Sequence, residues 1–280
     1  MEGTFEVVGR EKLLAEDAVV AASAAVGLLA SARDASVSMS EIQIFDTGWD
    51  FRVFKAAKWV IRVARNSVQS AKLSAECAFL DEIRPALTVP TPDSLEYAPG
   101  VSIGHWLPGC DLVNSDFVLV QGVLAENLAR LHRLPLSTLQ NAPAPSLSDT
   151  REKVAMVLRK AAVPGVMSAD VETLKGGLSD PQLWSYEPRI VHADLAACHI
   201  LFDKAKGRMS GIIDWADARI DDPAIDFAGI ERDLGDEAAD RLVAAYSSQM
   251  KTNLGERFRE RVHFRAAWAR VIECLQGGLS

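Results

Sequence analysis

The sequence lacks the features of several protein classes. Its four cysteines, Cys77, Cys110, Cys198 and Cys274, lie far apart and form none of the close pairs of a zinc site or a disulfide framework. It also has no excess of basic residues, because 38 acidic residues outweigh 30 basic ones and give a net charge of -8. Nucleic acids require a basic protein face, so no nucleic-acid partner is expected. The acidic balance suits a cationic small substrate, or serves solubility alone.

Long apolar runs and a targeting segment are missing as well. Residues 18–30 are the stretch most similar to a signal core, but they are too short to span a bilayer. Glu11, Glu16 and Asp17 precede them where a signal peptide is basic. We therefore expect no membrane association and a cytoplasmic protein, and a reducing compartment also suits the scattered cysteines.

A glycine-rich phosphate loop is the third missing feature. The chain contains no GxGxxG, and only Gly48, beside Trp49 and Asp50, stands near the place of such a loop. A hydrophobic content of 49% and a charged content of 24% are ordinary globular values. A chain of 280 residues is long for a single hydrophobic core and is of sufficient length for two lobes.

What the sequence does have is concentrated between Arg189 and Phe227. This stretch, RIVHADLAACHILFDKAKGRMSGIIDWADARIDDPAIDF, predicts strand, polar loop, strand, turn, strand and acidic loop. Strand pairing would bring Asp194 and Asp214 to one end of a small sheet. Single polar residues between strands often only mark turns. Four groups able to bind a proton or a cation, in a stretch otherwise suited to burial, need a further reason; they are His192, Asp194, His199 and Asp214.

Phosphoryl transfer supplies such a reason. Its transition state requires a carboxylate near the acceptor hydroxyl and ligands that hold magnesium on the phosphates. The protein-kinase pattern has His, any residue, Asp, and then a metal-binding Asn five positions after that Asp. Here His199 stands five positions after Asp194, and Asp214 follows after a hairpin. The spacing predicts Asp194 as the catalytic residue and His199 and Asp214 as the Mg²⁺ ligands.

At these residues the chain resembles the antibiotic kinases of the aminoglycoside phosphotransferase superfamily, which is protein-kinase-like. Their usual form is HGDLxxxN, then IDW or IDF, then DPxxD; this chain has HADLAACH, IDW and DPAID. With His199 in place of Asn, it is most similar to the macrolide 2′-phosphotransferases, although one branch of aminoglycoside kinases also has that His. Ala193 replaces the usual Gly, which matters only where the backbone needs a positive φ.

The resemblance implies an α+β, two-lobed, protein-kinase-like fold and a monomer. A small β-rich N-terminal nucleotide-binding lobe would span residues 1–103, a hinge 104–110, and a larger, mainly helical C-terminal catalytic and substrate-binding lobe 111–280. In the N-terminal lobe, the residue pattern predicts a helix at 10–31 followed by three strands at 41–48, 49–56 and 58–65.

The third of these strands should deliver a cation to the nucleotide phosphates. Arg62 stands where the kinase pattern has a Lys, and it would grip phosphate oxygens bidentately. Glu76, in the helix predicted at 70–80, is placed to pair with it, as an acid does in the family. An exposed Arg on an edge strand is the alternative, and Lys58 is the competing cation.

The segment around His105, Trp106 and Leu107 is typical of the hinge. Its backbone groups would pair with the purine edge, and Trp106 and Leu107 would flank the base. A Trp between strands is nevertheless more often part of a core or an interface.

Helical periodicity dominates the C-terminal lobe. The predicted helices are 116–134, 149–162 after a loop at 141–148, 169–174 ending at Gly176 and Gly177, 231–249, and 254–275. Phe258, Phe264, Trp268 and Val271 would face the core or the substrate cleft, and core is favoured. His132 is predicted to be structural and His192 to brace the catalytic loop. The resemblance implies that Asp226 anchors the strand that carries the site.

The resemblance implies a kinase that transfers the γ-phosphate of a purine nucleotide to the 2′-hydroxyl of a macrolide amino sugar and so confers resistance. GTP is the implied donor, with ATP as the alternative, and Mg²⁺ the cofactor. An acidic cleft near Asp194 would hold the amine of the sugar. An aminoglycoside or other small-molecule kinase, served by the acidic run 217–240, is a second hypothesis. A catalytically inactive nucleotide-binding protein is a third, although both Asp194 and Asp214 are retained.

Overall fold

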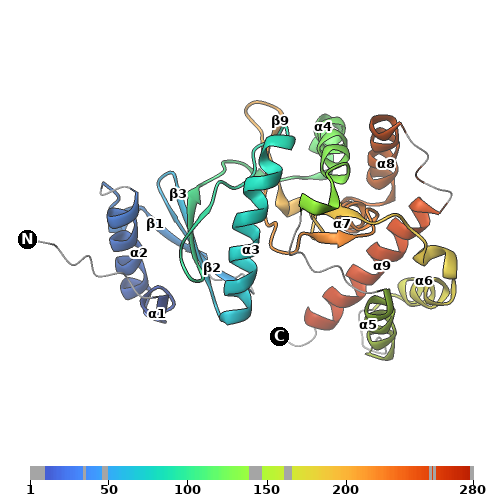
Figure 1. Cartoon of the computed structure of the whole chain (residues 1–280), viewed down its shortest axis with the longest axis horizontal. Helices are drawn as coiled ribbons and strands as arrows, with labels where there is room; N and C mark the ends of the chain where they lie inside the picture. The colour runs from blue at the N-terminus through green and yellow to red at the C-terminus, as the bar shows by residue number, and fades with distance from the viewer. Residues whose placement is uncertain are drawn as a thin grey trace, which may run out of the picture. The chain divides into compact units, whose positions relative to one another are not determined.

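The chain folds into two compact units of an α+β protein. The computed structural model describes residues 10–33, 36–45, 50–138, 147–160, 166–251, 254 and 257–277. The first unit comprises Met1–Glu82 and Thr91–Leu107, and the second Ile83–Pro90 and Pro108–Ser280. The first contains a small antiparallel sheet and the second is mainly helical, in agreement with the expected fold class (Figure 1). The boundary after Leu107 falls within the predicted hinge, but residues 83–90 group with the second unit instead of the first.

The first unit is built on a five-stranded antiparallel sheet in the order β1-β2-β3-β5-β4. Its strands are β1 Ile42–Phe45, β2 Phe51–Ala56, β3 Trp59–Ala64, β4 Leu95–Ala98 and β5 Val101–His105. The three strands expected at the start of this unit are confirmed, and residues 46–49 of the predicted first and second strands lie outside the described residues.

Helices cover both sides of these strands: α2 lies on one side and α3 on the other (Figure 1). The helix predicted at 10–31 is in fact two, α1 Arg10–Leu13 and α2 Ala18–Ala32, because Asp17 caps α2 by accepting hydrogen bonds from the amides of Val19 and Val20. The buried Leu28 of α2 packs with Phe54 and Ile61 of the sheet, and α3 spans Ser67–Ile83.

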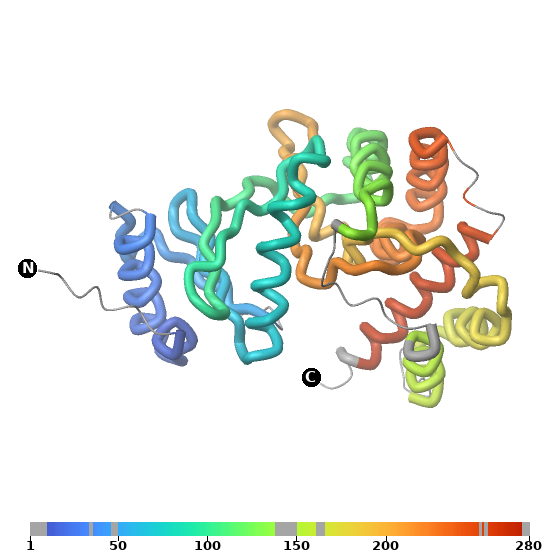
Figure 2. Tube along the Cα trace, in the orientation of Figure 1, coloured from blue at the N-terminus to red at the C-terminus, as the bar shows by residue number. Residues whose placement is uncertain are grey.

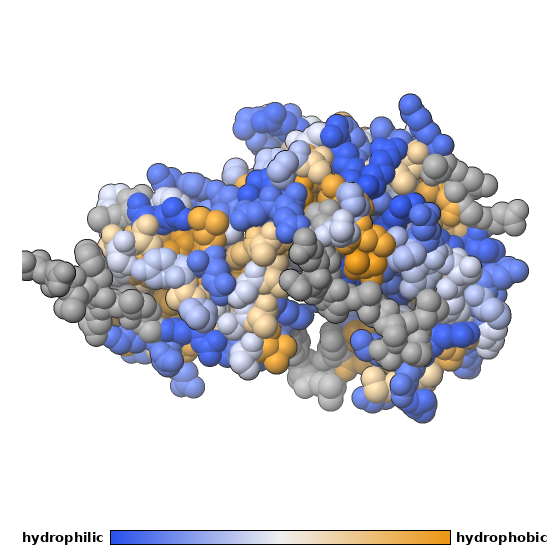
Figure 3. Space-filling model, in the orientation of Figure 1, coloured by the Kyte–Doolittle hydropathy of each residue, from blue (hydrophilic) through white to orange (hydrophobic). Residues whose placement is uncertain are grey.

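Two small sheets in the second unit carry the residues of the 189–227 stretch. In one, β6 Cys110–Asp111, β8 Ile200–Asp203 and β9 Arg208–Ile212 pair in the order β6-β8-β9. In the other, β7 Arg189–Val191 pairs with β10 Arg219–Asp221. The turn between β8 and β9, at the top of the view, is exposed and hydrophilic (Figure 3).

Helices make up the rest of the second unit, and α9 packs against α5, α6 and α7 (Figure 2). The helices are α4 Asn114–His132, α5 Leu147–Lys160, α6 Ser168–Ser179, α7 Ile225–Leu234, α8 Asp236–Met250 and α9 Phe258–Gly277. Short 3₁₀ turns occur at Met39–Glu41, Arg84–Ala86, Leu136–Thr138, Pro181–Trp184 and Ala197–His199. Most of the predicted loop at 141–148 lies outside the described residues. None of the described helices is both long and apolar enough to cross a membrane.

Two glycines behave differently from the prediction. The helix predicted at 231–249 is broken at Gly235, whose φ of +88° ends α7 before α8 begins. Gly176 and Gly177, by contrast, do not end their helix, because α6 continues to Ser179. A Cβ atom on Gly177 would lie 2.3 Å from the ring of Phe264 on α9, so this glycine permits close packing of α6 on α9.

This packing predicts opposite effects for two neighbouring substitutions. Gly177→Ala should lower the free energy of unfolding by about 1–3 kcal/mol, because the methyl group overlaps a ring in a buried site. Gly176→Ala should raise it by about 0.5–1 kcal/mol, because nothing lies within 4 Å of the added Cβ and Ala is the better helix former. Urea unfolding of both variants measures the difference; equal effects would show that α6 and α9 are not packed in this way.

Candidate active site

The loop after β7 is held by one buried carboxylate. Asp226, in the first turn of α7, accepts hydrogen bonds from the backbone amides of His192, at 3.0 Å, and Ala193, at 2.7 Å. Asp226 in turn accepts from His132 Nε2 at 3.0 Å, and His132 Nδ1 lies 2.8 Å from the hydroxyl of Tyr246. All these side chains are buried. His132 is therefore structural, and Asp226 makes the anchoring contact expected of it.

Ala193 does occupy a position that needs a positive φ. Its φ is +68°, in the left-handed region that costs an L-residue about 1 kcal/mol or more and costs glycine little. The usual Gly at this place in the motif is thereby explained. Here the strain is borne by Ala193, whose amide is fixed by Asp226.

Helix α7 contacts the same loop at two further points. A Cβ atom on Gly229 would lie 2.1 Å from the carbonyl oxygen of Leu195, so only glycine allows the two backbones to approach so closely. The carboxylate of Asp233 accepts a hydrogen bond from the amide of Ala197 at 2.8 Å. Asp226, Gly229 and Asp233, spaced at helical intervals, thus place the loop against one face of α7.

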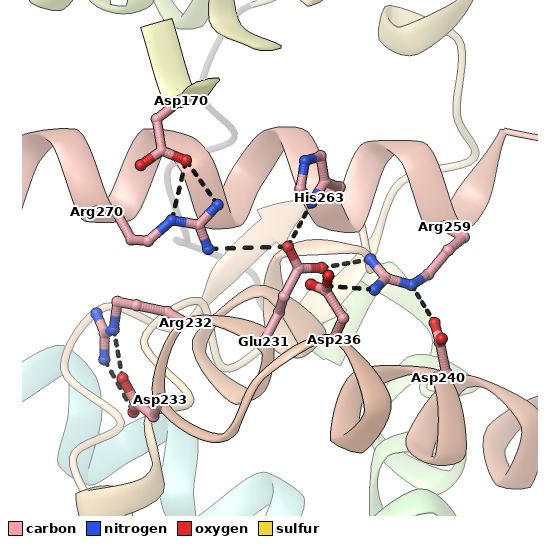
Figure 4. A network of polar contacts seen from close by, with 9 residues as sticks. All are labelled: Asp170, Glu231, Arg232, Asp233, Asp236, Asp240, Arg259, His263 and Arg270. Atoms are coloured by element: carbon pink, nitrogen blue, oxygen red, sulfur yellow. Dashed lines mark hydrogen bonds and ion pairs between the residues drawn. The ribbon is translucent and has the colours of Figure 1, made fainter. Parts of the chain in front are cut away.

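Helix α7 is itself fixed by a charged network (Figure 4). The buried carboxylate of Glu231 accepts from His263 at 2.6 Å and from Arg259, and Arg270 lies 3.8 Å away; all three are on α9. Arg270 also binds Asp170 of α6 at 2.7 Å. The network joins α6, α7 and α9 and so secures the helix that carries the anchors of the loop.

His199 lies between two carboxylates. Its Nδ1 atom donates to the backbone carbonyl of Asp194 at 2.6 Å, which leaves Nε2 directed at Asp214, 3.5 Å from Oδ2. The Asp194 carboxylate lies 3.6 Å from Nδ1. Pairing of the β8–β9 hairpin continues to a hydrogen bond from Ile213 to the carbonyl of His199, at 2.9 Å, and this brings Asp214 next to the histidine. The expected convergence of Asp194, His199 and Asp214 is present.

His192 braces this arrangement from behind. Its Nδ1 atom accepts from the amide of Asp194 at 3.3 Å, and its Nε2 donates to the carbonyl of Ile213 at 3.0 Å. Complete burial lowers the pKa of His192, so it stays neutral and keeps both contacts. It joins the loop that carries Asp194 to the segment that carries Asp214.

The environment shifts two pKa values in the cluster. Burial disfavours the charged form of His199, but hydrogen bonds with Cys198 and with the Asp194 carbonyl, and the charge of Asp214, outweigh it and raise the pKa of His199 to about 9. Burial raises the pKa of Asp194, with the nearby carboxylates of Asp214 and Asp217 adding to the effect and His199 opposing it.

The donor atoms of this cluster fit a magnesium ion. One oxygen each from Asp194 and Asp214 and one nitrogen of His199 all lie within 4.8 Å of one another, and carboxylate oxygens are the ligands that Mg²⁺ prefers. A second group with similar spacing, Glu231, Asp236 and His263, differs because the guanidinium of Arg259 already neutralises its carboxylates. A hard cation is therefore better accommodated at the first cluster.

A cavity of about 220 Å³ opens beside Asp194 in the second unit. Its wall is mostly apolar, and among the residues that the structure describes Asp194 is the one carboxylate that lines it. The remaining charged side chains of the wall are three arginines, Arg219, Arg232 and Arg265. The expected acidic cleft near Asp194 is therefore not found in this cavity, which we call the Asp194 pocket.

Trp268 also lines the Asp194 pocket. The sequence pattern favoured a core position for it together with Phe258, Phe264 and Val271, and those three are indeed buried. Trp268 and Arg265, three residues apart on α9, share the face turned to the pocket. Helical periodicity alone could not identify this face, because the pocket is formed together with the loop after β7, which is distant in sequence.

In the first unit, the predicted pair of Arg62 and Glu76 is formed. Arg62 Nη1 lies 2.7 Å from each oxygen of the buried Glu76 carboxylate, and the guanidinium lies over the ring of Phe51 at 4.4 Å. Lys58, the competing cation, is exposed in the turn between β2 and β3. Arg62 is the better fixed of the two, because Glu76 and the ring of Phe51 hold its guanidinium.

The predicted base-binding segment has partners of its own within the first unit. The amide of His105 donates to Asp93 at 2.7 Å, and the amide of Trp106 donates to the carbonyl of Lys58 at 2.8 Å. The ring of Trp106 stacks on Phe45, with centroids 5.9 Å apart. The amides of His105 and Trp106 are therefore already engaged within the first unit.

A family model described as the phosphotransferase enzyme family matches residues 41–261. The chain belongs to the phosphotransferase enzyme family. This phosphotransferase is 28% identical to the uncharacterized protein YcbJ of Bacillus subtilis (strain 168) over 244 residues, 78% of each chain.

Solved structures similar to the phosphotransferase include enzymes of both antibiotic classes. With macrolide 2′-phosphotransferase type I the TM-score is 0.74 at 24% identity, and the match covers 91% of each chain. With the GDP complex of wild-type aminoglycoside 2′-phosphotransferase-IIIa the TM-score is also 0.74, at 18% identity over 89% of each chain. At these identities the similarity shows a shared fold and leaves the substrate open.

The raised pKa of His199 predicts that magnesium binding to the phosphotransferase depends on pH. A metal ion must displace the proton from Nε2, so apparent Mg²⁺ affinity should rise up to about tenfold per pH unit between 6.5 and 9 and then level off. In His199→Asn this dependence should vanish, because an amide carries no such proton. Calorimetric titration with MgCl₂ across this range measures it.

The folding stability of the metal-free protein provides the control for the His199 titration. Since the folded pKa exceeds the unfolded one, the proton on His199 stabilises the fold fully below pH 6.5, and this stabilisation is lost as the pH rises through about 9. The stability difference between wild type and His199→Asn should follow the same window. If the apparent Mg²⁺ affinities of wild type and His199→Asn changed with pH in the same way, His199 would not be a magnesium ligand.

Proposed function

We propose that this phosphotransferase transfers the γ-phosphate of a purine nucleotide, GTP by resemblance, to the 2′-hydroxyl of the amino sugar of a macrolide. The observation that carries the proposal is the position of His199, fixed through Nδ1 on the Asp194 carbonyl and directed through Nε2 at Asp214. This gives a general base and a metal site within one cluster, as phosphoryl transfer requires.

Asp194 serves as the catalytic residue in this proposal. It would accept or orient the proton of the acceptor hydroxyl, and it lines the pocket from which an acceptor would approach. Its raised pKa makes the carboxylate a stronger base than an exposed aspartate.

His199 Nε2 and the Asp214 carboxylate would hold Mg²⁺, which neutralises phosphate charge when bound. Arg62, kept in place by Glu76, would contribute a further positive charge to the phosphates. The backbone of residues 105–107 would contact the base, through carbonyls and the Leu107 amide.

The lining of the Asp194 pocket favours a macrolide over an aminoglycoside. Leu195, Ile225 and Ile272 offer an apolar wall suited to a macrolide ring, whereas a polycation would find only the Asp194 carboxylate among the described lining residues. The tertiary amine of the sugar would meet the carboxylates of Asp194 and Asp217, which lie close enough to interact with each other.

A second cavity, of about 660 Å³, is the acidic one. It is lined by Asp180, Asp236, Asp240 and Glu260, together with Arg257 and Arg259. Asp194 is not among its lining residues, so a polyamine held within that cavity would not meet the proposed base. An inactive, nucleotide-binding role is also less well supported, because Asp194, His199 and Asp214 are all in place.

Substitution of the two aspartates should separate chemistry from metal binding. Asp194→Ala should lower kcat by about 10²–10⁴-fold with nucleotide affinity nearly unchanged, because a general base acts in the chemical step. Asp214→Asn should remove the magnesium-dependent rise in melting temperature caused by nucleotide. Asp203→Asn, at the β8–β9 turn and paired with Lys206, is the control and should change neither quantity. A large loss of nucleotide affinity in Asp194→Ala would indicate that Asp194 is a metal ligand and not the general base.

One activity panel tests the function itself. GTP and ATP are each combined with erythromycin-type macrolides, the same macrolides without the amino sugar, and kanamycin, and phosphate transfer is followed. We expect transfer only to macrolides that keep the amino sugar, and faster transfer from GTP. Transfer to kanamycin alone would overturn the macrolide assignment, and faster use of ATP would overturn only the donor.

A further inference from the structure

Two residues that line the Asp194 pocket each have a buried nitrogen atom without a hydrogen-bond partner. Within the described part of the chain, the buried side-chain nitrogens that lack a partner include Nη1 of Arg265 and Nε1 of Trp268. Both residues line the Asp194 pocket. A buried donor without a partner is unfavourable in a folded protein, so two at one cavity call for an explanation.

Internal contacts hold Arg265 but do not use its full capacity. Its side chain is 3% exposed, and Nη2 makes one long contact, 3.4 Å, with Asp221. Asp221 is shared with Arg219, at 3.0 Å, and with the hydroxyl of Tyr186, at 3.3 Å. Because a guanidinium can donate five hydrogen bonds, Arg265 retains donors for a further acceptor.

Trp268 lies beside this guanidinium. The Arg265 guanidinium carbon is 5.5 Å from the centre of the Trp268 ring, and the two residues are three positions apart on α9. An indole N–H only donates, as does a guanidinium N–H. The pair therefore requires an acceptor oxygen and cannot be satisfied by an ammonium group.

We propose that Arg265 and Trp268 form a subsite for a carbonyl-type oxygen, a carboxylate, ketone or ester, of the molecule that is phosphorylated. This rests on the proposed function for the identity of the reaction and adds a requirement on the acceptor. The acceptor places its hydroxyl at Asp194, its apolar part on Leu195 and Ile272, and its carbonyl oxygen at α9. Polyamine sugars without a carbonyl group lack the matching acceptor.

Small aromatic probes test the subsite without nucleotide or turnover. The chain has six tryptophans, and an NMR spectrum of ¹⁵N-indole-labelled protein shows a separate signal for each indole N–H group. The Trp268 signal is assigned by its loss in Trp268→Phe, a variant that keeps a ring in place. Benzoate, benzamide and benzylamine share the ring and differ in the group it carries. Benzoate and benzamide should shift the Trp268 signal, and benzylamine should not.

Matched variants on α9 separate binding from folding. Arg265→Lys should weaken benzoate binding about tenfold, because a guanidinium donates to a carboxylate in a geometry that an ammonium does not reproduce. Arg261→Lys is the control: Arg261 is similarly buried, pairs with Asp222 at 3.0 Å and does not line the pocket, so benzoate affinity should stay within about twofold. In Trp268→Phe, the KM for a macrolide should rise about threefold to tenfold with the KM for nucleotide unchanged.

The outcomes are distinct. Binding of benzoate alone supports a carboxylate as the preferred group, and binding of benzoate and benzamide supports a carbonyl oxygen of either kind. A Trp268 signal that responds to none of the probes, or equally to benzylamine, overturns the subsite, as does benzoate affinity equally affected by Arg265→Lys and Arg261→Lys. Should Arg265→Lys fail to fold, Trp268→Phe decides by its effect on the macrolide KM. Failure of phosphate transfer to any macrolide would refute the proposed function and leave the probe-binding result standing.

Discussion

The site depends on a carboxylate that takes no part in the chemistry. Asp226 is fully buried, and burial alone would raise its pKa, yet its hydrogen bonds with the His132 side chain and the backbone amide of Ala193 hold that pKa below its usual range, so the group stays ionised. An ionised carboxylate in the interior needs several donors, and here the backbone amides of His192 and Ala193 supply two of them. The path of the loop, the left-handed Ala193 and the direction of Asp194 all follow from satisfying this one charge.

The histidine at position 199 gives the cluster a property that an amide would not. Because Nδ1 is committed to the Asp194 carbonyl, the single atom left for a metal is also the atom that binds a proton. A magnesium ion held here would compete with that proton for one position, and the charge of Asp214, which would attract the ion, also raises the affinity of the imidazole for the proton. An Asn in the same place would keep the geometry without the competition.

The sequence predicted the elements that local chemistry determines. Spacing predicted the grouping of Asp194, His199 and Asp214, and strand and helix positions predicted the pair of Arg62 and Glu76. In both cases short connections in the sequence join the residues that meet. Features that depend on contacts between distant elements could not be predicted. Gly177 does not end α6 because Phe264, 87 residues later in sequence, packs on it, and Ala193, with its positive φ, is held by Asp226 on the distant helix α7. Asp17 divides the helix predicted at 10–31, and Gly235 divides the one predicted at 231–249. Both breaks had a local signal in the sequence, since Asp is a typical N-cap residue and Gly a typical C-cap residue.

Net charge proved a poor guide to the pocket. The chain carries a charge of -8, yet the wall beside Asp194 has three arginines, because the acidic residues near them are turned toward those arginines as partners. Asp221 binds Arg219 and Arg265, and Asp233 binds Arg232. A run of acidic residues in sequence can therefore produce a cavity with a basic or apolar lining, because the carboxylates are used in fixing the guanidinium groups. The ligand that such a cavity would select depends on the hydrogen-bond donors that these pairings leave without a partner. For the proposed acceptor, Arg265 and Trp268 are therefore a better guide than the net charge of the chain.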